Sequence, residues 1–393
     1  MLGPGSCRRP RRRGAGAALT LVFAGVLAAA VVTDSLPREK PDEPRALSEA
    51  ARPAGATVDR RALSAAAAEA IADGKSGTQA AEEFVSRSGD RWGAVYDRRE
   101  YEEFEQALDG TYTGVGLSAR RTADGRVEVA RVRAEGPAGR AGLQAGDRLR
   151  SIDGRPVDGL SVSEVVSLLR GDGVSGSAVA LGVERGRAVW TATLYRVRLA
   201  TEPVTVQRLD DGAVLIRVAA FTKGAGERVR EAVRAAPAGA GVLLDLRGNS
   251  GGLVSEAAVA ASAFLDGGLV ATYDVEGEQR AVYAESGGDT HRPVVALIDG
   301  GTMSAAELLT GALQDRGRAV TVGSRTFGKG SVQMPSALPG GSVAELTVGH
   351  YRTPAGHGVD GRGIVPDLTV GDGAGEPAEK RARTVLSGLR GGS

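Results

Sequence analysis

The sequence predicts a multidomain protein of the α/β (α+β) class, and two patterns lead to this fold class. From about residue 204 onward, short and nearly all-apolar runs alternate with stretches of helical periodicity, which is typical of strands and helices packed in layers. Between about residues 112 and 198, strand-like runs are separated by glycine turns, as in a small β-rich domain. Residues 58–108, ahead of both, have helical periodicity.

The N-terminus has the pattern of an export signal. Five arginines at positions 8–13 precede an uncharged run of 19 residues, 14–32. This run is longer than the usual core of a signal peptide and close to the minimum for a bilayer span. We therefore expect residues 1–32 to be either a cleaved signal peptide or an uncleaved membrane anchor. In both cases the rest of the chain is expected outside the cytoplasmic membrane, as a single-pass membrane protein or a secreted one.

The remaining boundaries follow from changes in composition and period. Prolines and charges without periodicity predict a linker at 33–55, followed by a helical segment at 56–110. The β-rich domain is expected at 111–200, the α/β core at 201–372 and a tail at 373–393. Within them we expect strands at 126–132, 148–152, 179–184, 189–195, 241–246 and 294–298, and helices at 162–169, 253–265 and 303–314.

Composition excludes several functional classes. The formal net charge is +1, so bulk charge does not indicate a nucleic-acid partner. Cys7 is the sole cysteine, which excludes a disulfide within the chain and a metal site built from cysteines. We expect no metal and no cofactor.

Ser304 is the first candidate catalytic residue, because it lies between a buried strand and a helix. Ser304 followed by Glu307 also forms a capping box, which stabilises a helix start without any catalysis. The same position would suit a nucleophile, since amides at a helix N-terminus can face an oxyanion.

Lys329 favours the catalytic interpretation. It is the only lysine between Lys223 and Lys380, an interval that holds eleven arginines. A general base must release its proton, which arginine cannot do in a protein. A lysine half deprotonated near neutral pH needs a pKa lowered by roughly 3 units, or about 4 kcal/mol. The glycines beside Lys329 do not have the spacing of a phosphate-binding loop.

Residues 111–198 resemble a PDZ domain. The resemblance is carried by Gly114-Val115-Gly116-Leu117, by residues 141–147 and by residues 151–154. It implies that the glycine-rich loop binds the carboxylate of a protein's C-terminal tail and that the tail adds to the sheet edge. The helix at 162–169 would form the other wall of the groove, lined by Val165, Leu168 and Leu169. The alternative is an unrelated small β-rich domain.

Residues 300–367 and the upstream run 244–252 resemble the carboxyl-terminal processing, or tail-specific, proteases. The matching runs are 304–307, 311–315, 326–333, 351–354 and 363–367. The resemblance implies a crotonase-like peptidase core and a Ser304–Lys329 dyad. It also implies that Gln333 orients the lysine. Two departures stand out: Thr302 and Met303 replace a usual Ser-Ala, and Ser250 replaces a usual Pro.

The expected oxyanion hole combines the amide of Ala305 with one from the Gly251–Gly252 turn, for which we favour Gly251. The run 248–252 also resembles the nucleophile motif of trypsin-like proteases, with Ser250 as nucleophile. Those enzymes place a histidine base before the serine, whereas all three histidines here follow it.

The function implied is a serine endopeptidase that cleaves exported proteins recognised by their free C-terminal tails. The alternative from another class is a non-catalytic PDZ scaffold on an inactive peptidase core. The presence of Ser304, Lys329 and Gln333 together argues against this alternative.

Overall fold

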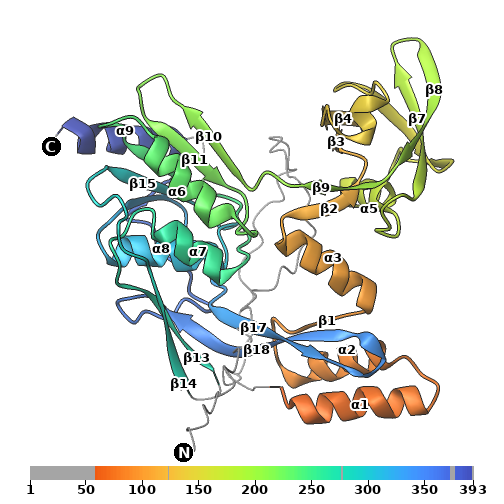
Figure 1. The fold of residues 1–393 in the computed structure, drawn as a ribbon, viewed down its shortest axis with the longest axis horizontal. Helices are drawn as coiled ribbons and strands as arrows, with labels where there is room; N and C mark the ends of the chain where they lie inside the picture. Colours follow the sequence, from red (N-terminus) through yellow and green to blue (C-terminus); the bar gives the residue numbers. More distant parts are fainter. Residues whose placement is uncertain (1–57, 123, 276–277, 372–376, 392–393) are drawn as a thin grey trace, which may run out of the picture.

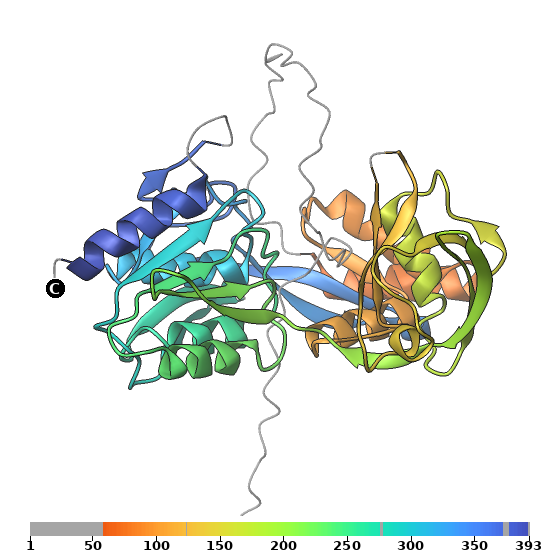
Figure 2. The same cartoon turned by 90° about the horizontal axis from the view of Figure 1, so that it is seen from above.

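The computed structural model describes residues 58–122, 124–275, 278–371 and 377–391. The predicted signal or anchor at 1–32 and the predicted linker at 33–55 lie outside these residues. Within the described part of the chain, no helix combines the length and the apolar character that crossing a membrane would require. Figures 1 and 2 show two lobes, joined by a long β-hairpin and by an extended connection.

The N-terminal segment consists of α1 (Arg60–Ala72), α2 (Gly77–Ser88), β1 (Ala94–Tyr96) and α3 (Arg98–Leu108). Side chains of Asp59, Ser76 and Asp97 cap the three helices, as their oxygens accept otherwise unpaired amides of the first turn. The apolar faces of α1 and α2 pack on a hairpin from the far end of the chain, in a cluster that includes Leu63 and Leu346.

The PDZ-like lobe is a sheet of the order β3-β4-β5-β7-β8, with β6 paired to β5. Alternating buried residues such as Val127, Val129 and Leu181 give it a core of its own. Its elements are β3 (Leu117–Arg121), β4 (Val127–Val132), α4 (Pro137–Arg140), β5 (Arg148–Ile152), β6 (Arg155–Pro156), α5 (Val162–Arg170), β7 (Ala178–Arg185) and β8 (Ala188–Tyr195).

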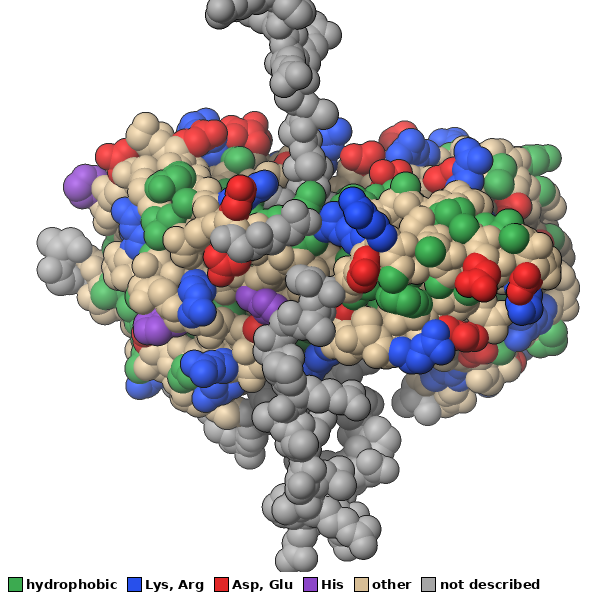
Figure 3. All heavy atoms as spheres, turned by 90° about the horizontal axis from the view of Figure 1, so that it is seen from below, with side chains coloured by type: hydrophobic (Ala, Val, Ile, Leu, Met, Phe, Trp, Pro, Cys, Tyr) green, Lys and Arg blue, Asp and Glu red, His purple; other side chains and the backbone are tan. Residues whose placement is uncertain are grey.

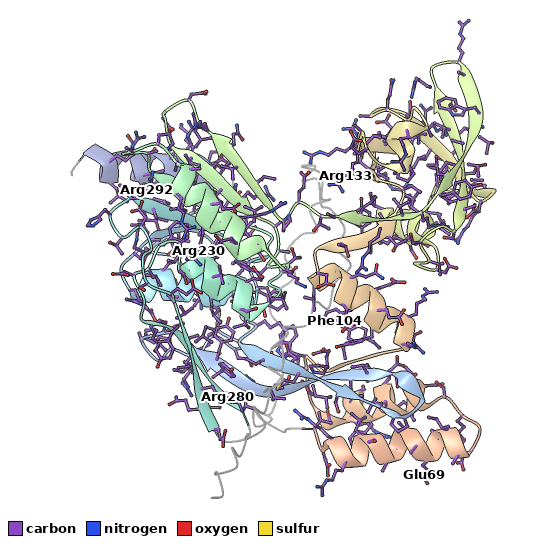
Figure 4. All side chains as sticks on the ribbon, viewed as in Figure 1. Glu69, Phe104, Arg133, Arg230, Arg280 and Arg292 are labelled. Carbon is purple, nitrogen blue, oxygen red and sulfur yellow. The ribbon has the colours of Figure 1, made fainter. Side chains whose placement is uncertain are left out.

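Two antiparallel strands connect this lobe to the rest of the molecule. β2 (Thr111–Gly114) pairs with β9 (Val197–Ala200), so the chain enters and leaves the lobe side by side. Next to this connection, α3 lies above the long hairpin of residues 331–352 (Figure 4). The Phe104 ring of α3 stacks on the Tyr96 ring, with centroids 5.2 Å apart.

The peptidase-like core is built on a six-stranded sheet of the order β10-β11-β12-β15-β16-β19. All neighbouring pairs are parallel except β10 with β11. The central strands are buried along their length, which explains their nearly all-apolar sequences. The strands are β10 (Val204–Arg208), β11 (Val214–Val218), β12 (Val242–Asp245), β15 (Val294–Ile298), β16 (Val320–Gly323) and β19 (Leu368–Thr369).

Helices cover both faces of this sheet (Figure 1). On one face are α6 (Ala225–Ala235), α7 (Val254–Ala261) and α8 (Ala305–Asp315), which share the largest apolar cluster. On the other face α9 (Ala378–Gly391) packs through Ala382 and Leu386. Because α8 follows β15 directly, its N-terminus lies at the carboxyl end of the parallel strands.

A second sheet joins the core to the N-terminal segment, in the order β1-β18-β13-β14 with β17 also paired to β18. Register pairs such as Ala94 with Glu345 bring the N-terminal segment against a strand that lies about 250 residues later in the chain. The elements are β13 (Leu269–Val275), β14 (Glu278–Tyr283), β17 (Ser331–Ala337), the 3₁₀ turn η1 (Pro339–Gly341) and β18 (Val343–Arg352). Figure 3 shows positive and negative side chains interspersed on one face of the described residues.

The predicted strands and helices of the two folded regions all occur, with ends shifted by a few residues. The fold class is therefore confirmed. The sequence analysis did not predict β1 or its pairing with β18.

Candidate active site

Ser304 has an unusual backbone conformation at the start of α8. Its φ is 61° and its ψ −121°, and it is one of two non-glycine residues with positive φ in the described part of the chain. Such a conformation costs on the order of 1–3 kcal/mol and persists only where the surroundings impose it. The Ser304 side chain is fully buried, and its hydroxyl forms no hydrogen bond to any described residue. A strained serine with a buried and unpartnered hydroxyl is compatible with a nucleophile site.

The carboxylate of Glu307 joins the nucleophile to the lysine loop. One oxygen accepts hydrogen bonds from the amides of Ser304 (2.8 Å) and Lys329 (2.9 Å). The other accepts from the Gly328 amide (2.7 Å) and the Thr326 hydroxyl (2.5 Å). Glu307 is fully buried, and burial raises its pKa while these four bonds lower it. The helix-capping interpretation was correct for its bond to Ser304, and the same side chain also fixes the backbone of the loop that carries Lys329.

Lys329 is fully buried in the glycine-flanked loop between β16 and β17. Burial lowers the pKa of Lys329 from its ordinary value to about 8, against the opposing effect of nearby carboxylates. A substantial fraction of this amine is therefore neutral at mildly alkaline pH, as a general base must be. The Ser304 hydroxyl is not bonded to it in this conformation, and catalytic hydrogen bonds often form only when substrate is bound.

Gln333 is fully buried on β17, four residues beyond the lysine. Its amide nitrogen donates to the hydroxyls of Ser331 (2.8 Å) and Thr347 (3.2 Å). These bonds fix the side-chain amide between two strands. The structure thus brings Ser304, Lys329 and Gln333 into one buried region, while the role of each stays a prediction.

The turn after β12 abuts the nucleophile. A Cβ on Gly251 would lie 2.8 Å from the Ser304 Cβ and 3.2 Å from the Ala305 nitrogen, so only glycine fits there. The Gly251 amide, however, donates to the Asn249 side chain at 2.9 Å. Within the described residues, the amides of Ala305 and Gly252 have no acceptor. The geometry therefore favours Gly252 over Gly251 as the second amide for an oxyanion.

The departures from the usual motif leave this turn intact. The Thr302 hydroxyl donates to the Leu246 carbonyl at 2.9 Å and accepts from the Asp299 amide at 3.0 Å. Ser250 is half-buried, and two of the three histidines that follow it have carboxylate partners elsewhere. His350 lies 3.6 Å from Asp360, and His357 lies 3.7 Å from Asp315. No group of metal-ligating side chains occurs among the residues that the structure describes.

Residues 213–370 match the model of peptidase family S41, and residues 128–185 match a PDZ domain. A carboxyl-terminal-processing protease of Synechocystis is 34% identical over 303 residues, spanning 74% of this chain and 70% of that protein.

The chain belongs to the carboxyl-terminal-processing proteases of peptidase family S41. A carboxy-terminal processing protease of Bacillus subtilis, named CtpA, is 28% identical over 71% of this chain and 60% of its own length. Several of the curated relatives are spanned over less than two thirds of their length. A solved structure from Bacteroides fragilis, described as an S41 protease, has the same fold, with a TM-score of 0.52 at 17% identity over 79% of this chain and 90% of that one.

In the PDZ domain, the predicted carboxylate loop lies just before an edge strand. Gly116 has a φ of 76°, and Leu117 begins β3, which pairs on one side only. Val115 is buried in the domain core together with Val165 and Leu169 of α5. Leu168 is only partly buried. Gly114 is the last residue of β2. The role of residues 114–117, Val165 and Leu169 in binding a C-terminal tail stays a prediction.

Two residues near the dyad were missed by the sequence analysis. Asp90 and Trp92 lie in the loop between α2 and β1, more than 200 residues before Lys329. The Lys329 nitrogen lies 5.0 Å from the Trp92 ring centroid. No local pattern marks them, because the pairing of β1 with β18 is what places them there.

Proposed function

We propose that this protein is a serine endopeptidase with Ser304 as nucleophile and Lys329 as general base. The observation that carries the proposal is the link through Glu307, which holds a strained, unpartnered serine and a buried lysine on one carboxylate. Membership of the carboxyl-terminal-processing family supports it.

In the first chemical step, the neutral Lys329 amine takes the proton of the Ser304 hydroxyl as its Oγ bonds to the carbon of the scissile peptide. The carbonyl π electrons move to the oxygen. When this tetrahedral species collapses, the C–N bond breaks and the leaving amine takes the proton from Lys329. Water then hydrolyses the ester, with Lys329 accepting its proton and returning one to Ser304.

The negative oxygen of each tetrahedral species needs donors that are in place beforehand. We assign them to the amides of Ala305, the residue directly after Ser304, and of Gly252, because neither amide has an acceptor among the described residues. Gln333 orients the lysine from β17.

The substrates we propose are exported proteins held by their C-terminal tails at the PDZ domain. The basic and apolar N-terminal pattern supports a location outside the cytoplasmic membrane. Deleting residues 1–32 should leave the protein in the cytosolic fraction. If the deleted form still reached the membrane or the medium, residues 1–32 would not be the targeting segment.

The activity is tested by incubating the wild type with an unstructured protein and following its fragments by mass spectrometry. Ser304→Ala should lower the cleavage rate by at least about 10³-fold, because the nucleophile is lost. Ser250→Ala is the matched control and should cleave at the wild-type rate. Absence of cleavage by both the wild type and Ser304→Ala would instead fit the non-catalytic PDZ scaffold, and equal non-zero rates would show that Ser304 is not the nucleophile.

A further inference from the structure

The loop between α2 and β1, residues 89–93, reaches from the N-terminal segment into the peptidase core. The Asp90 carboxylate accepts the Thr347 amide at 2.8 Å and the Thr347 hydroxyl at 2.7 Å, a contact 257 residues apart in the chain. The Thr347 hydroxyl in turn accepts from the Gln333 amide nitrogen at 3.2 Å. A hydrogen-bonded chain therefore runs from Asp90 to the residue that is proposed to orient the lysine.

Two residues further along, the indole of Trp92 lies over the lysine itself. The Lys329 nitrogen is 5.0 Å from the centroid of the Trp92 ring. The ring centroids of Trp92 and Phe327 are 5.8 Å apart. Lys329 is fully buried although Phe327, two residues before it, is 44% exposed. Trp92 is part of the cover that separates the amine from solvent.

The loop is held rigidly in this position. A single oxygen of Asp90 accepts the amides of Trp92 (3.1 Å) and Gly93 (2.9 Å), which fixes the turn. Directly after the turn, Ala94 pairs with Glu345 of β18. The indole is thus positioned before any substrate arrives.

We propose that this loop completes the active site from the N-terminal segment, with Trp92 shielding Lys329 from water and Asp90 holding Gln333 in place through Thr347. Both are positioning residues, and the inference rests on the proposed function of the Ser304–Lys329 dyad.

The two residues act on the lysine in opposite directions. Burial, to which Trp92 contributes, lowers the pKa of Lys329 to about 8 and outweighs the attraction between a ring face and an ammonium. The negative charge of Asp90 raises that pKa. The carboxylates that face Lys329 from the other elements and also raise its pKa are Glu345 of β18, Asp360 of the loop after β18, and Glu307 of α8.

The experiment measures kcat/KM against pH from 6 to 10.5 for full-length variants, where the rising limb reports the lysine. Trp92→Ser admits water, so the midpoint should rise by about one pH unit. Trp92→Leu keeps an apolar cover and should keep the midpoint at or below that of the wild type.

Asp90→Asn should move the midpoint the other way, by about half a unit to one unit, because a negative neighbour is lost. Its kcat should also fall, since the amide group cannot accept both donors of Thr347. Asp97→Asn is the matched control from the same segment: asparagine caps a helix as well as aspartate does, and the midpoint should not move. Damage to folding alone would not shift two midpoints in opposite directions.

A variant too slow to assay is followed in the Ser304→Ala background, by measuring reductive methylation of Lys329 against pH with mass spectrometry. The midpoints should shift in the same directions. Midpoints that coincide for wild type, Trp92→Ser and Asp90→Asn would overturn the inference. Failure of the proposed function would be recognised separately, as equal cleavage by wild type and Ser304→Ala.

Discussion

In the peptidase core the groups that carry the proposed chemistry are buried, whereas in the PDZ domain the strand expected to receive a peptide lies at an open sheet edge. Ser304, Lys329 and Glu307 are all fully buried. β3 is the outermost strand in its sheet, so one side of its backbone is unpaired. Removing a hydrogen-bond partner from a buried charged group costs more free energy than altering one of several contacts at a sheet edge. Single changes should therefore have larger effects in the core than in the PDZ domain.

The largest effect is expected at Glu307. In Glu307→Gln one carboxylate oxygen becomes an NH₂ group, which cannot accept from the amides or hydroxyl that now face it. We expect the unfolding free energy to fall by about 3 kcal/mol. The Ser304 and Lys329 loops should also separate, lowering kcat/KM by about 100-fold or more, because small misplacements of reacting groups are costly. Denaturant unfolding and peptide cleavage measure the two effects.

Glu256→Gln is the matched control. Glu256 also accepts two backbone amides with its two oxygens, those of Gly224 (2.9 Å) and Gly226 (2.8 Å) at the start of α6, but it lies in the first turn of α7 and is only partly buried. It should lose about 1 kcal/mol and keep its activity. If both variants behaved alike, the special role of Glu307 would be wrong.

A second buried carboxylate should destabilise the core at alkaline pH. Both side-chain oxygens of Glu345 lack a hydrogen-bond partner among the described residues. Burial raises the pKa of Glu345 to about 7, and the Lys329 charge opposes this. The folded state therefore binds a proton that the unfolded state has released between about pH 4.5 and 7, so stability falls as pH rises through this window.

Glu345→Gln removes this cost. The unfolding free energy should increase by about 2 kcal/mol at pH 8 and change little at pH 4.5. The activity profile should move to lower pH, because the lysine loses a negative neighbour. Glu69→Gln, on the exposed face of α1 (Figure 4), should change neither quantity. A stability gain that is the same at both pH values would contradict the assignment.

The PDZ domain should give the smallest effect. Amidating the C-terminus of a substrate with an apolar last residue removes the charge that backbone amides near β3 are expected to bind, so cleavage should slow by about tenfold. Substituting Gly116 would be a poorer test than amidation. Its φ of 76° and a contact of 3.2 Å between an added Cβ and Gly136 would strain the loop itself. Equal rates for free and amidated tails would show that this loop does not recognise the carboxylate.

The difference between local and long-range information explains what the sequence could predict. Ser304, Ala305 and Lys329 could be predicted from short local runs, and Gln333 from the family resemblance of such a run, although the role of each stays a prediction. Asp90 and Trp92 could not be predicted, because a three-residue strand paired across some 250 residues brings them to the site. A strand that short carries too little periodicity to be recognised.

The choice between Gly251 and Gly252 as an oxyanion donor stays a prediction, and it depends on a different kind of information. The two glycines are adjacent and both have positive φ, 103° and 130°. The decisive fact is that the Asn249 side chain already accepts the Gly251 amide. Side-chain orientation within a turn depends on packing, here of Asn249 against the Val218 carbonyl, and the sequence does not reveal it.

The central claim, that Ser304 is activated by Lys329, is tested most directly by labelling with a fluorophosphonate that bonds covalently to an activated serine. The label is mapped by mass spectrometry, and its rate is measured from pH 6 to pH 10 for the wild type and for Lys329→Arg. The account predicts label on Ser304, a rate that rises with pH with a midpoint near the lysine pKa of about 8, and almost no label in Lys329→Arg. Label on Ser250, or a Ser304 rate that is unchanged in Lys329→Arg, would contradict it.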